Sequence, residues 1–178
     1  MVSCKEVKVR LVPFTKKYLG LVYKLYQNQS FMNEFGDMDA DEKTYESLLK
    51  WYEEVADDTA TELYAIKKSN DDVIVGFVHV DDIDEYEETA WLSIGIDPDF
   101  QNIGYGKEAI CLTLGYLFNE RELKKCRLGV LSHNKRAIHL YESLGFVLEH
   151  VIPRSKFTCH KEPDIYQMIL LNASHKTI

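Results

Sequence analysis

The first third of the chain carries one strand pattern and two helical patterns. Apolar residues occupy every second position near the start, which predicts a strand over Lys5–Val12. Apolar residues then recur three or four positions apart, which predicts a helix capped by Thr15 and ending near Gln27. A polar and acidic stretch, Ser30–Asp41, separates this helix from a second one expected over Glu42–Val55.

From residue 62 onward the pattern changes to strands separated by turns and further helices. A hairpin is expected around the turn Ser69–Asp72, and the last two strands are expected to pair with each other. The order of these elements predicts an α/β fold, in which helices cover both faces of a mixed sheet. In chain order, the predicted elements are strands over Leu63–Lys67, Val73–Val80 and Thr89–Ile96, a helix over Gly104–Phe118, a strand over Lys125–Leu131, a helix over Lys135–Leu144, and strands over Phe146–Ile152 and Asp164–Leu171.

Length and charge narrow the class of protein. The 178 residues show no repeat and no linker-like stretch, so a single domain over 1–178 is expected. No apolar run approaches the roughly 20 residues of a membrane span, and Met1–Arg10 lacks the order of a signal peptide, which favours the cytoplasm and no membrane partner. The formal charge, 21 − 29 = −8, argues against nucleic-acid binding and is compatible with a cationic partner.

The four cysteines are scattered along the sequence. No CxxC pair is present and no histidine lies at a metal-ligand spacing, so neither a metal site nor a disulfide is expected. Cys111 and Cys126 sit inside apolar stretches, which predicts that they are small buried side chains. The other two are Cys4 and Cys159.

A glycine-containing loop before the long central helix is the first candidate for chemistry. Glycines at the start of a helix allow free backbone N–H groups to approach an anion, which the helix dipole also favours. A phosphate or pyrophosphate site is therefore expected, although a simple tight turn would also account for the glycines. A dinucleotide fingerprint fits poorly, because several residues separate the strand from the first glycine and no acidic residue follows the next strand. The loop residues are Gln101, Asn102, Ile103, Gly104, Tyr105, Gly106 and Lys107.

A second motif lies downstream, Asn134-x-x-Ala137-x-x-x-Tyr141-x-x-x-Gly145-Phe146. Together with Gln101-x-x-Gly104-x-Gly106, it resembles the GNAT superfamily of N-acetyltransferases, and in particular its RimJ/RimL and spermidine-acetyltransferase-like branch. The two motifs stand in the order of the family and at about its spacing. Val9–Pro13 and Asp164–Leu171 resemble the same branch, so the likeness extends over nearly the whole chain.

The resemblance implies the GNAT fold, a mostly antiparallel sheet with one splayed parallel strand pair. It implies acetyl-CoA as cosubstrate and direct attack on its thioester by a primary amine: a protein N-terminal amine, a polyamine or another small cationic amine. A homodimer is common among such relatives. The pantetheine arm would bind backbone groups of Leu92, Ile94 and Ile96, with the Ile94 N–H as the oxyanion donor. The alternatives are a non-catalytic acyl-CoA-binding module and, remotely, a nicotinamide-dependent oxidoreductase.

Tyr141 is the predicted catalytic acid. Its phenol, with a pKa of about 10, suits protonation of a departing thiolate. Asn134 lies seven residues earlier on the same helix face and is a candidate cofactor contact, as is Ala137. Two simpler interpretations stay open: Tyr141 only packs beside its leucine neighbours, and Asn134 or Ser132 only caps the helix.

The general base stays unassigned. Many family members carry a glutamate on the strand before the glycine loop, whereas this chain has Trp91, Leu92 and Ser93 there. Nearby acids are expected to be solvated loop charges, and a water chain would serve equally well. These acids are Asp81, Asp82, Asp84 and Glu88. The acceptor cleft is expected between Ser30–Asp41, Asp81–Glu88 and Phe157–Pro163, where Phe31, Phe35 and Trp91 are either walls or core residues.

Overall fold

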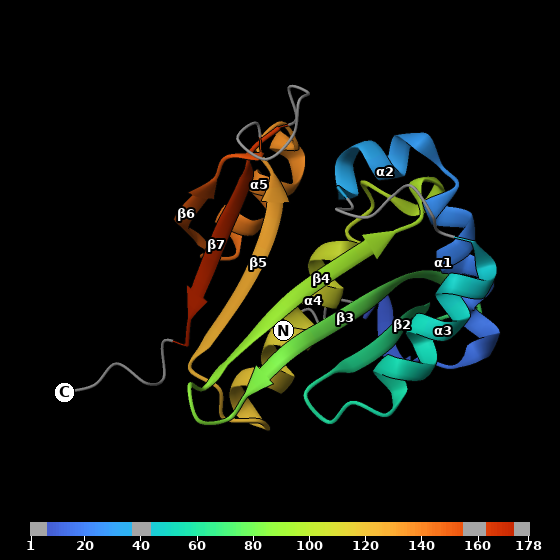
Figure 1. The fold of residues 1–178 in the computed structure, drawn as a ribbon, viewed down its shortest axis with the longest axis horizontal. Coiled ribbons are helices and arrows are strands. Elements are labelled where there is room, and N and C mark those ends of the chain that lie inside the picture. The colour runs from blue at the N-terminus through green and yellow to red at the C-terminus, as the bar shows by residue number, and fades with distance from the viewer. Residues whose placement is uncertain (1–6, 37–43, 155–162, 173–178) are drawn as a thin grey trace, which may run out of the picture.

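The computed structural model describes residues 7–36, 44–154 and 163–172, built around one seven-stranded sheet of order β1-β2-β3-β4-β5-β7-β6 (Figure 1). The strands are β1 Val9–Pro13, β2 Glu62–Lys68, β3 Ile74–Asp84, β4 Thr89–Ile96, β5 Lys125–Leu131, β6 Val147–Ile152 and β7 Ile165–Leu171. The helices are α1 Leu19–Tyr26, α2 Gln29–Phe35, α3 Tyr45–Ala56, α4 Tyr105–Asn119 and α5 Lys135–Ser143, with short 3-10 helices at Lys16–Tyr18 and Pro98–Phe100.

One strand pair interrupts an otherwise antiparallel sheet. β1 to β4 pair antiparallel in chain order, and β7 pairs antiparallel with both β5 and β6. β4 and β5 run parallel and are joined by only three residue pairs, from Thr89–Lys125 to Trp91–Arg127. Beyond these pairs the two strands diverge, and a gap widens toward their carboxyl ends (Figure 1). The mixed sheet, the final strand pair and the splayed parallel pair are as expected.

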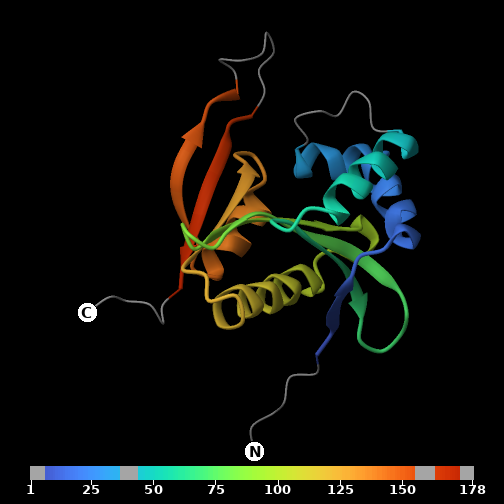
Figure 2. The same ribbon diagram turned by 60° about the horizontal axis from the view of Figure 1, so that its bottom comes forward.

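Each face of the sheet carries its own hydrophobic core. The larger core joins the sheet to α4 and α5, whereas the smaller core joins the other face to α1, α2 and α3 (Figure 2). Successive side chains of β3 point to opposite faces of the sheet, so Val78 and Val80 belong to the larger core and Phe77 belongs to the smaller one. The expected coverage of both faces by helices is confirmed.

Two predictions about the first helical region were wrong. Thr15 makes no capping hydrogen bond through its side chain, and the chain enters α1 through a 3-10 turn. The stretch Ser30–Asp41 contains most of α2, which Asn28 caps by accepting the N–H of Phe31 at 3.0 Å. This helix is only seven residues long, so it offers too few turns for an apolar period to be detected.

Two further predictions need correction. The strand expected to end at Val80 continues to Asp84, because a register irregularity with Asp82 at φ 46° lets β3 and β4 pair past it. Asp81 and Asp84 are therefore strand residues. Cys126 is buried as expected, but Cys111 is exposed, since it lies outside the buried face of α4, which contains Ile110, Thr113 and Leu114. Cys4 and Cys159 lie outside the described residues.

No helix in the described ranges combines the length and apolar character that a membrane crossing demands. In the same ranges, no group of three or more metal-ligating side chains is placed to hold a metal ion.

Candidate active site

The inner edge of β4 faces the gap with unpaired backbone groups. Asp97 donates its N–H to the carbonyl of Val75 at 2.9 Å, which makes these residues a hydrogen-bonded pair between β3 and β4. Such pairs alternate with non-bonded pairs along an antiparallel ladder, and this register is continuous as far as the pair Asp81–Trp91. The odd-numbered residues of this part of β4 therefore bond to β3, and the even-numbered ones turn their N–H and C=O groups toward β5.

These even-numbered residues are Leu92, Ile94 and Ile96, the three positions predicted to bind the pantetheine arm. Because β5 leaves the ladder after the Trp91–Arg127 pair, the backbone of Ile94 has no strand partner on the gap side. Ile96 is partly occupied, since Gln101 donates its side-chain Nε2 to the Ile96 carbonyl at 3.0 Å. The structure thus presents an open peptide edge, which an extended polar chain can pair with.

The start of α4 presents the second set of free donors. Gly104 adopts φ 95° at the N-cap and provides no capping side chain. The first hydrogen bond at this end runs from the Glu108 N–H to the Gly104 carbonyl at 3.1 Å. Among the described residues, the N–H groups of Tyr105, Gly106 and Lys107 have no acceptor at this end of the helix. Free N–H groups and a positive helix end together fit a pyrophosphate.

Two basic side chains flank this loop, and neither was singled out from the sequence. Lys8 donates its Nζ to the Ile103 carbonyl at 3.0 Å. Arg136, in the first turn of α5, donates to Asn102 Oδ1 at 3.4 Å. Lys8 and Ile103 are 95 residues apart in the sequence, and Arg136 and Asn102 are 34 residues apart. Short sequence patterns therefore could not predict these contacts. Gln101 braces the loop against β4, so its amide is directed to the protein backbone.

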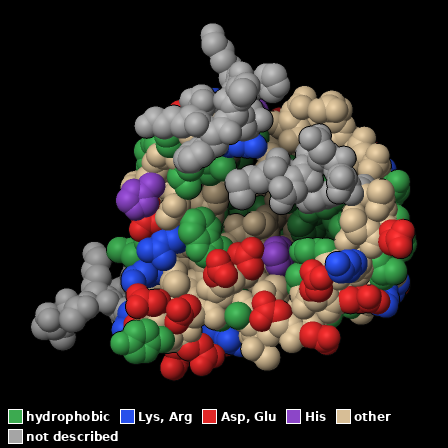
Figure 3. All heavy atoms as spheres, viewed as in Figure 1, with side chains coloured by type: hydrophobic (Ala, Val, Ile, Leu, Met, Phe, Trp, Pro, Cys, Tyr) green, Lys and Arg blue, Asp and Glu red, His purple; other side chains and the backbone are tan. Residues whose placement is uncertain are grey.

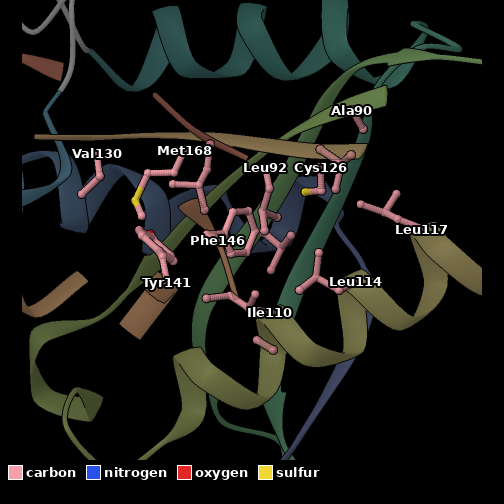
Figure 4. Close-up of a cluster of buried hydrophobic side chains, with 14 of the residues drawn as sticks. Ala90, Leu92, Ile110, Leu114, Leu117, Cys126, Val130, Tyr141, Phe146 and Met168 are labelled. Atoms are coloured by element: carbon pink, nitrogen blue, oxygen red, sulfur yellow. The ribbon is translucent and has the colours of Figure 1, made fainter. Parts of the chain in front are cut away.

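Tyr141 lies at the edge of the larger core, on the side of the gap formed by β5 and α5. Its side chain is buried and meets the Phe146 ring edge-on, with ring centroids 5.9 Å apart. Figure 4 shows Tyr141 beside Val130 and Met168, within the cluster that also holds Leu92 of β4. Desolvation raises the pKa of Tyr141 to about 12. Its hydroxyl has no hydrogen-bond partner among the described residues, so the phenol keeps its proton and remains free to donate it.

Asn134 is the N-cap of α5, so the simpler interpretation of this residue as a helix cap is confirmed. Its Oδ1 accepts the N–H of Ala137 at 3.1 Å, and its Nδ2 donates to the carbonyl of Glu34 at 3.1 Å. His133 Nε2 lies 2.8 Å from the Asn33 carbonyl, and Arg136 forms an ion pair with Glu34. The start of α5 is thus tied to α2. A contact of Asn134 or Ala137 with the cofactor stays a prediction.

The face of the sheet opposite α4 carries polar groups beside the gap. His79 and Asp81 of β3 pair with Ser93 and Trp91 of β4, so the four side chains share this face. His79 Nδ1 lies 3.5 Å from Asp81 Oδ2, and the Trp51 ring meets the imidazole edge-on at 5.6 Å. Figure 3 shows a hollow on this face, with acidic side chains and a histidine along its edge.

The aromatic residues expected near the acceptor separate into two groups. Phe31 is buried in the smaller core and stacks on Phe35 at 5.0 Å, so these two rings pack α2 against the sheet. Trp91 is half-buried and belongs to neither core cluster of the described residues. Trp91 therefore remains a candidate wall of the acceptor site, and Trp51, which the sequence did not indicate, is another.

The class of the protein follows from a family comparison: it is an N-acetyltransferase that uses acetyl-CoA. A model of the GNAT acetyltransferase domain matches residues 8–147, and the chain belongs to this family. The chain is 26% identical over 157 residues to the spermidine N(1)-acetyltransferase of Vibrio cholerae, covering 88% of this chain and 89% of that one. It is 27% identical over 184 residues to the corresponding enzyme of Escherichia coli K12, covering 99% and 94%.

The fold agrees with a solved relative. The crystal structure of Vibrio cholerae spermidine N-acetyltransferase in complex with CoA and spermine superimposes with a TM-score of 0.83 and 24% identity. The match covers 92% of this chain and 95% of that one. At this identity the likeness shows the fold alone.

Proposed function

We propose that this enzyme acetylates a primary amine of a polyamine such as spermidine. The observation that carries the proposal is the Asp81 carboxylate, which is paired across the ladder with Trp91 beside the open edge of β4, on the face where Figure 3 shows a hollow with acidic side chains. A carboxylate attracts an ammonium group, and an indole face also favours a cation. The names of the relatives from Vibrio cholerae and Escherichia coli support the same substrate class.

In this proposal the two halves of the gap hold different parts of acetyl-CoA. The backbone groups of Leu92, Ile94 and Ile96 pair with the pantetheine amides, and the amides from Ile103 to Lys107 receive the pyrophosphate. Gln101 and Asn102 shape this loop, and Lys8 and Arg136 add positive charge beside it. Asn134 and Ala137 line the opposite wall at the start of α5.

The chemistry follows from the groups on either side of the thioester. The acceptor nitrogen forms a bond to the acetyl carbon, the N–H of Ile94 stabilises the resulting oxyanion, and the C–S bond then breaks. Tyr141 gives its proton to the departing thiolate, for which a protonated and unpartnered phenol is suited. Attack is direct, in a ternary complex of enzyme, acetyl-CoA and amine.

The test is transfer to a defined set of acceptors. The protein is incubated with acetyl-CoA and, separately, spermidine, an aminoglycoside or peptides with different N-termini, and CoA thiol release is measured. A reaction without amine corrects for the protein's own thiols, of which Cys111 is exposed. We expect thiol release with spermidine and an acetylated polyamine in the products. Transfer to peptides with none to spermidine would contradict the proposed substrate class.

A further inference from the structure

Asp81 differs from Asp84, Glu88 and Glu149, three other acids around the gap, in what its side chain contacts. Asp84 accepts the N–H groups of Tyr86 and Glu87, both at 2.8 Å, and so holds the turn between β3 and β4. Glu88 is paired with Lys124 at 2.6 Å. Both carboxylates therefore have structural partners that satisfy them.

Glu149, on the far side of the gap, is satisfied in the same way. It accepts two hydrogen bonds from Arg127, at 2.8 and 3.1 Å, and a third from Gln167 at 2.8 Å. Among the described residues, the Asp81 carboxylate accepts a hydrogen bond from its own backbone N–H and none from another residue, and it lies 3.5 Å from His79 Nδ1. On this face, Asp81 is thus the half-buried carboxylate that is left available to a ligand.

The sheet places Asp81 next to the reacting groups. Its partner across the ladder is Trp91, the last residue of β4 that pairs with β5 before the gap opens. Hydrogen-bonded partners on neighbouring strands lie about 5.5 Å apart at Cα. An amine held on this face by Asp81 is therefore one strand away from the open peptide edge, against which the thioester is proposed to lie.

Building on the proposed polyamine acetylation, we propose that Asp81 receives the proton of the acceptor ammonium and that His79 positions its carboxylate. One N–H bond of the ammonium breaks, its proton passes to an Asp81 oxygen, and the electron pair left on nitrogen becomes the nucleophile. As the tetrahedral intermediate collapses, the C–S bond breaks and Tyr141 gives its proton to the thiolate, and the second proton lost by the nitrogen restores the Tyr141 phenol. Asp81 then releases its proton to water.

The environment of Asp81 suits this exchange. Burial, and secondarily the neighbouring charge of Asp82, raise the pKa of Asp81 to about 6, so its carboxylate binds a proton more readily than an exposed one. Desolvation also lowers the pKa of His79, which keeps the imidazole neutral near pH 7. In this proposal a neutral imidazole directs its Nδ1–H toward the Asp81 carboxylate 3.5 Å away, and its buried Nε2 has no partner among the described residues.

The experiment compares Asp81→Asn with wild type on amines of different acidity. Spermidine is one acceptor, and a fluorinated diamine of similar length, whose ammonium is more acidic, is the other. We expect Asp81→Asn to lower kcat/KM for spermidine by about 100-fold or more at neutral pH. The loss should be clearly smaller for the fluorinated amine, because more of it reaches the enzyme already deprotonated. Affinity for acetyl-CoA should be unchanged.

Three further variants complete the design. Asp81→Glu, which keeps a carboxylate, should recover part of the spermidine rate. His79→Gln should lower kcat with little change in the KM for acetyl-CoA, because His79 is proposed to position the Asp81 carboxylate and not to touch acetyl-CoA. Glu120→Gln, which removes one exposed negative charge beyond α4, should behave as wild type. If Asp81→Asn does not fold, Asp81→Ser replaces it in the same comparison.

The outcomes separate this inference from the function on which it rests. No transfer to spermidine by the wild-type enzyme would overturn the proposed function. Transfer by wild type with no loss in Asp81→Asn would overturn the inference alone. An equal loss for both amines would also overturn it, because Asp81 would then bind the acceptor without taking its proton.

Discussion

Replacing Tyr141 by phenylalanine tests the acid while leaving the fold intact. The substitution removes one oxygen and keeps the ring that packs against Phe146. Because that hydroxyl has no hydrogen-bond partner among the described residues, the free energy of unfolding should stay within about 1 kcal/mol of wild type. Turnover should behave differently, since the phenol is proposed to carry the proton that the thiolate needs.

The expected loss of turnover in Tyr141→Phe follows from the role of Tyr141 as a general acid. A positioned general acid contributes about 10²- to 10⁴-fold, which corresponds to about 2.7–5.4 kcal/mol of activation free energy. Because the pKa of Tyr141 is raised to about 12, the phenol stays protonated through the neutral range and this loss should not depend on pH there. The assay is CoA thiol release at saturating acetyl-CoA and spermidine, with acetyl-CoA affinity measured separately by calorimetry.

Tyr64→Phe is the matched control. It also removes a tyrosine hydroxyl, one bonded to Glu62 at 2.7 Å on the face of the sheet that packs on α4, and its turnover should equal that of wild type. The refuting result for Tyr141→Phe is wild-type turnover with the fold intact. Tyr141 would then be a packing residue, and the thiolate would take its proton from elsewhere.

Three other substitutions are expected to have measurable effects. Gly104→Ala places a side chain at φ 95°, so it should cost about 1–2 kcal/mol and weaken acetyl-CoA binding, as checked by thermal melting and titration calorimetry; an unchanged melting temperature would contradict the strain argument. Gly95→Ala puts a Cβ 2.6 Å from the Phe77 ring and should cost about 1–3 kcal/mol in urea unfolding; an unchanged free energy of unfolding would contradict this. Asp81→Asn should raise the free energy of unfolding at neutral pH. The pKa of Asp81 is about 6 in the folded protein and 3.8 in the unfolded chain, so the wild-type protein loses stability as the pH rises from about 4 to about 6 and the variant does not. Urea unfolding at pH 4 and pH 7.5 should show this gain vanishing at the lower pH, and an equal gain at both would refute it.

The bounds of the helices and strands around the proposed cofactor site could be predicted from the sequence, because residues that favour the ends of helices and strands stand at those bounds. β4 and β5 have the predicted bounds, and α4 begins within a residue of Gly104. Gly145, at φ 96°, ends α5 as expected. Asn134 and Tyr141 could be placed on one helix face from their spacing alone, since that spacing is a property of the helix.

Other features depend on contacts that no local pattern encodes. Asp81 belongs to the sheet because β3 pairs with β4 one residue beyond the predicted end at Val80, and the irregularity at Asp82 then lets Asp84 pair as well. Lys8 reaches the glycine loop, and Glu34 reaches the start of α5, only after the chain has folded. The gap itself arises because β5 leaves β4 after three residue pairs, and register of that kind is fixed by packing of whole elements.

The short parallel junction makes the cofactor part of the architecture. Only three residue pairs join the sheet at its centre, and the larger core and the contacts of α5 with α2 also connect its two parts. In the proposed binding mode, the pantetheine amides lie along Ile94 as an extra strand, and acetyl-CoA completes the backbone ladder at this point. Its binding free energy adds to the resistance of the whole fold to unfolding, about 2.7 kcal/mol at a hundredfold excess over Kd. On this binding mode, the protein loaded with acetyl-CoA should resist unfolding more than the free protein, which urea unfolding with and without acetyl-CoA measures.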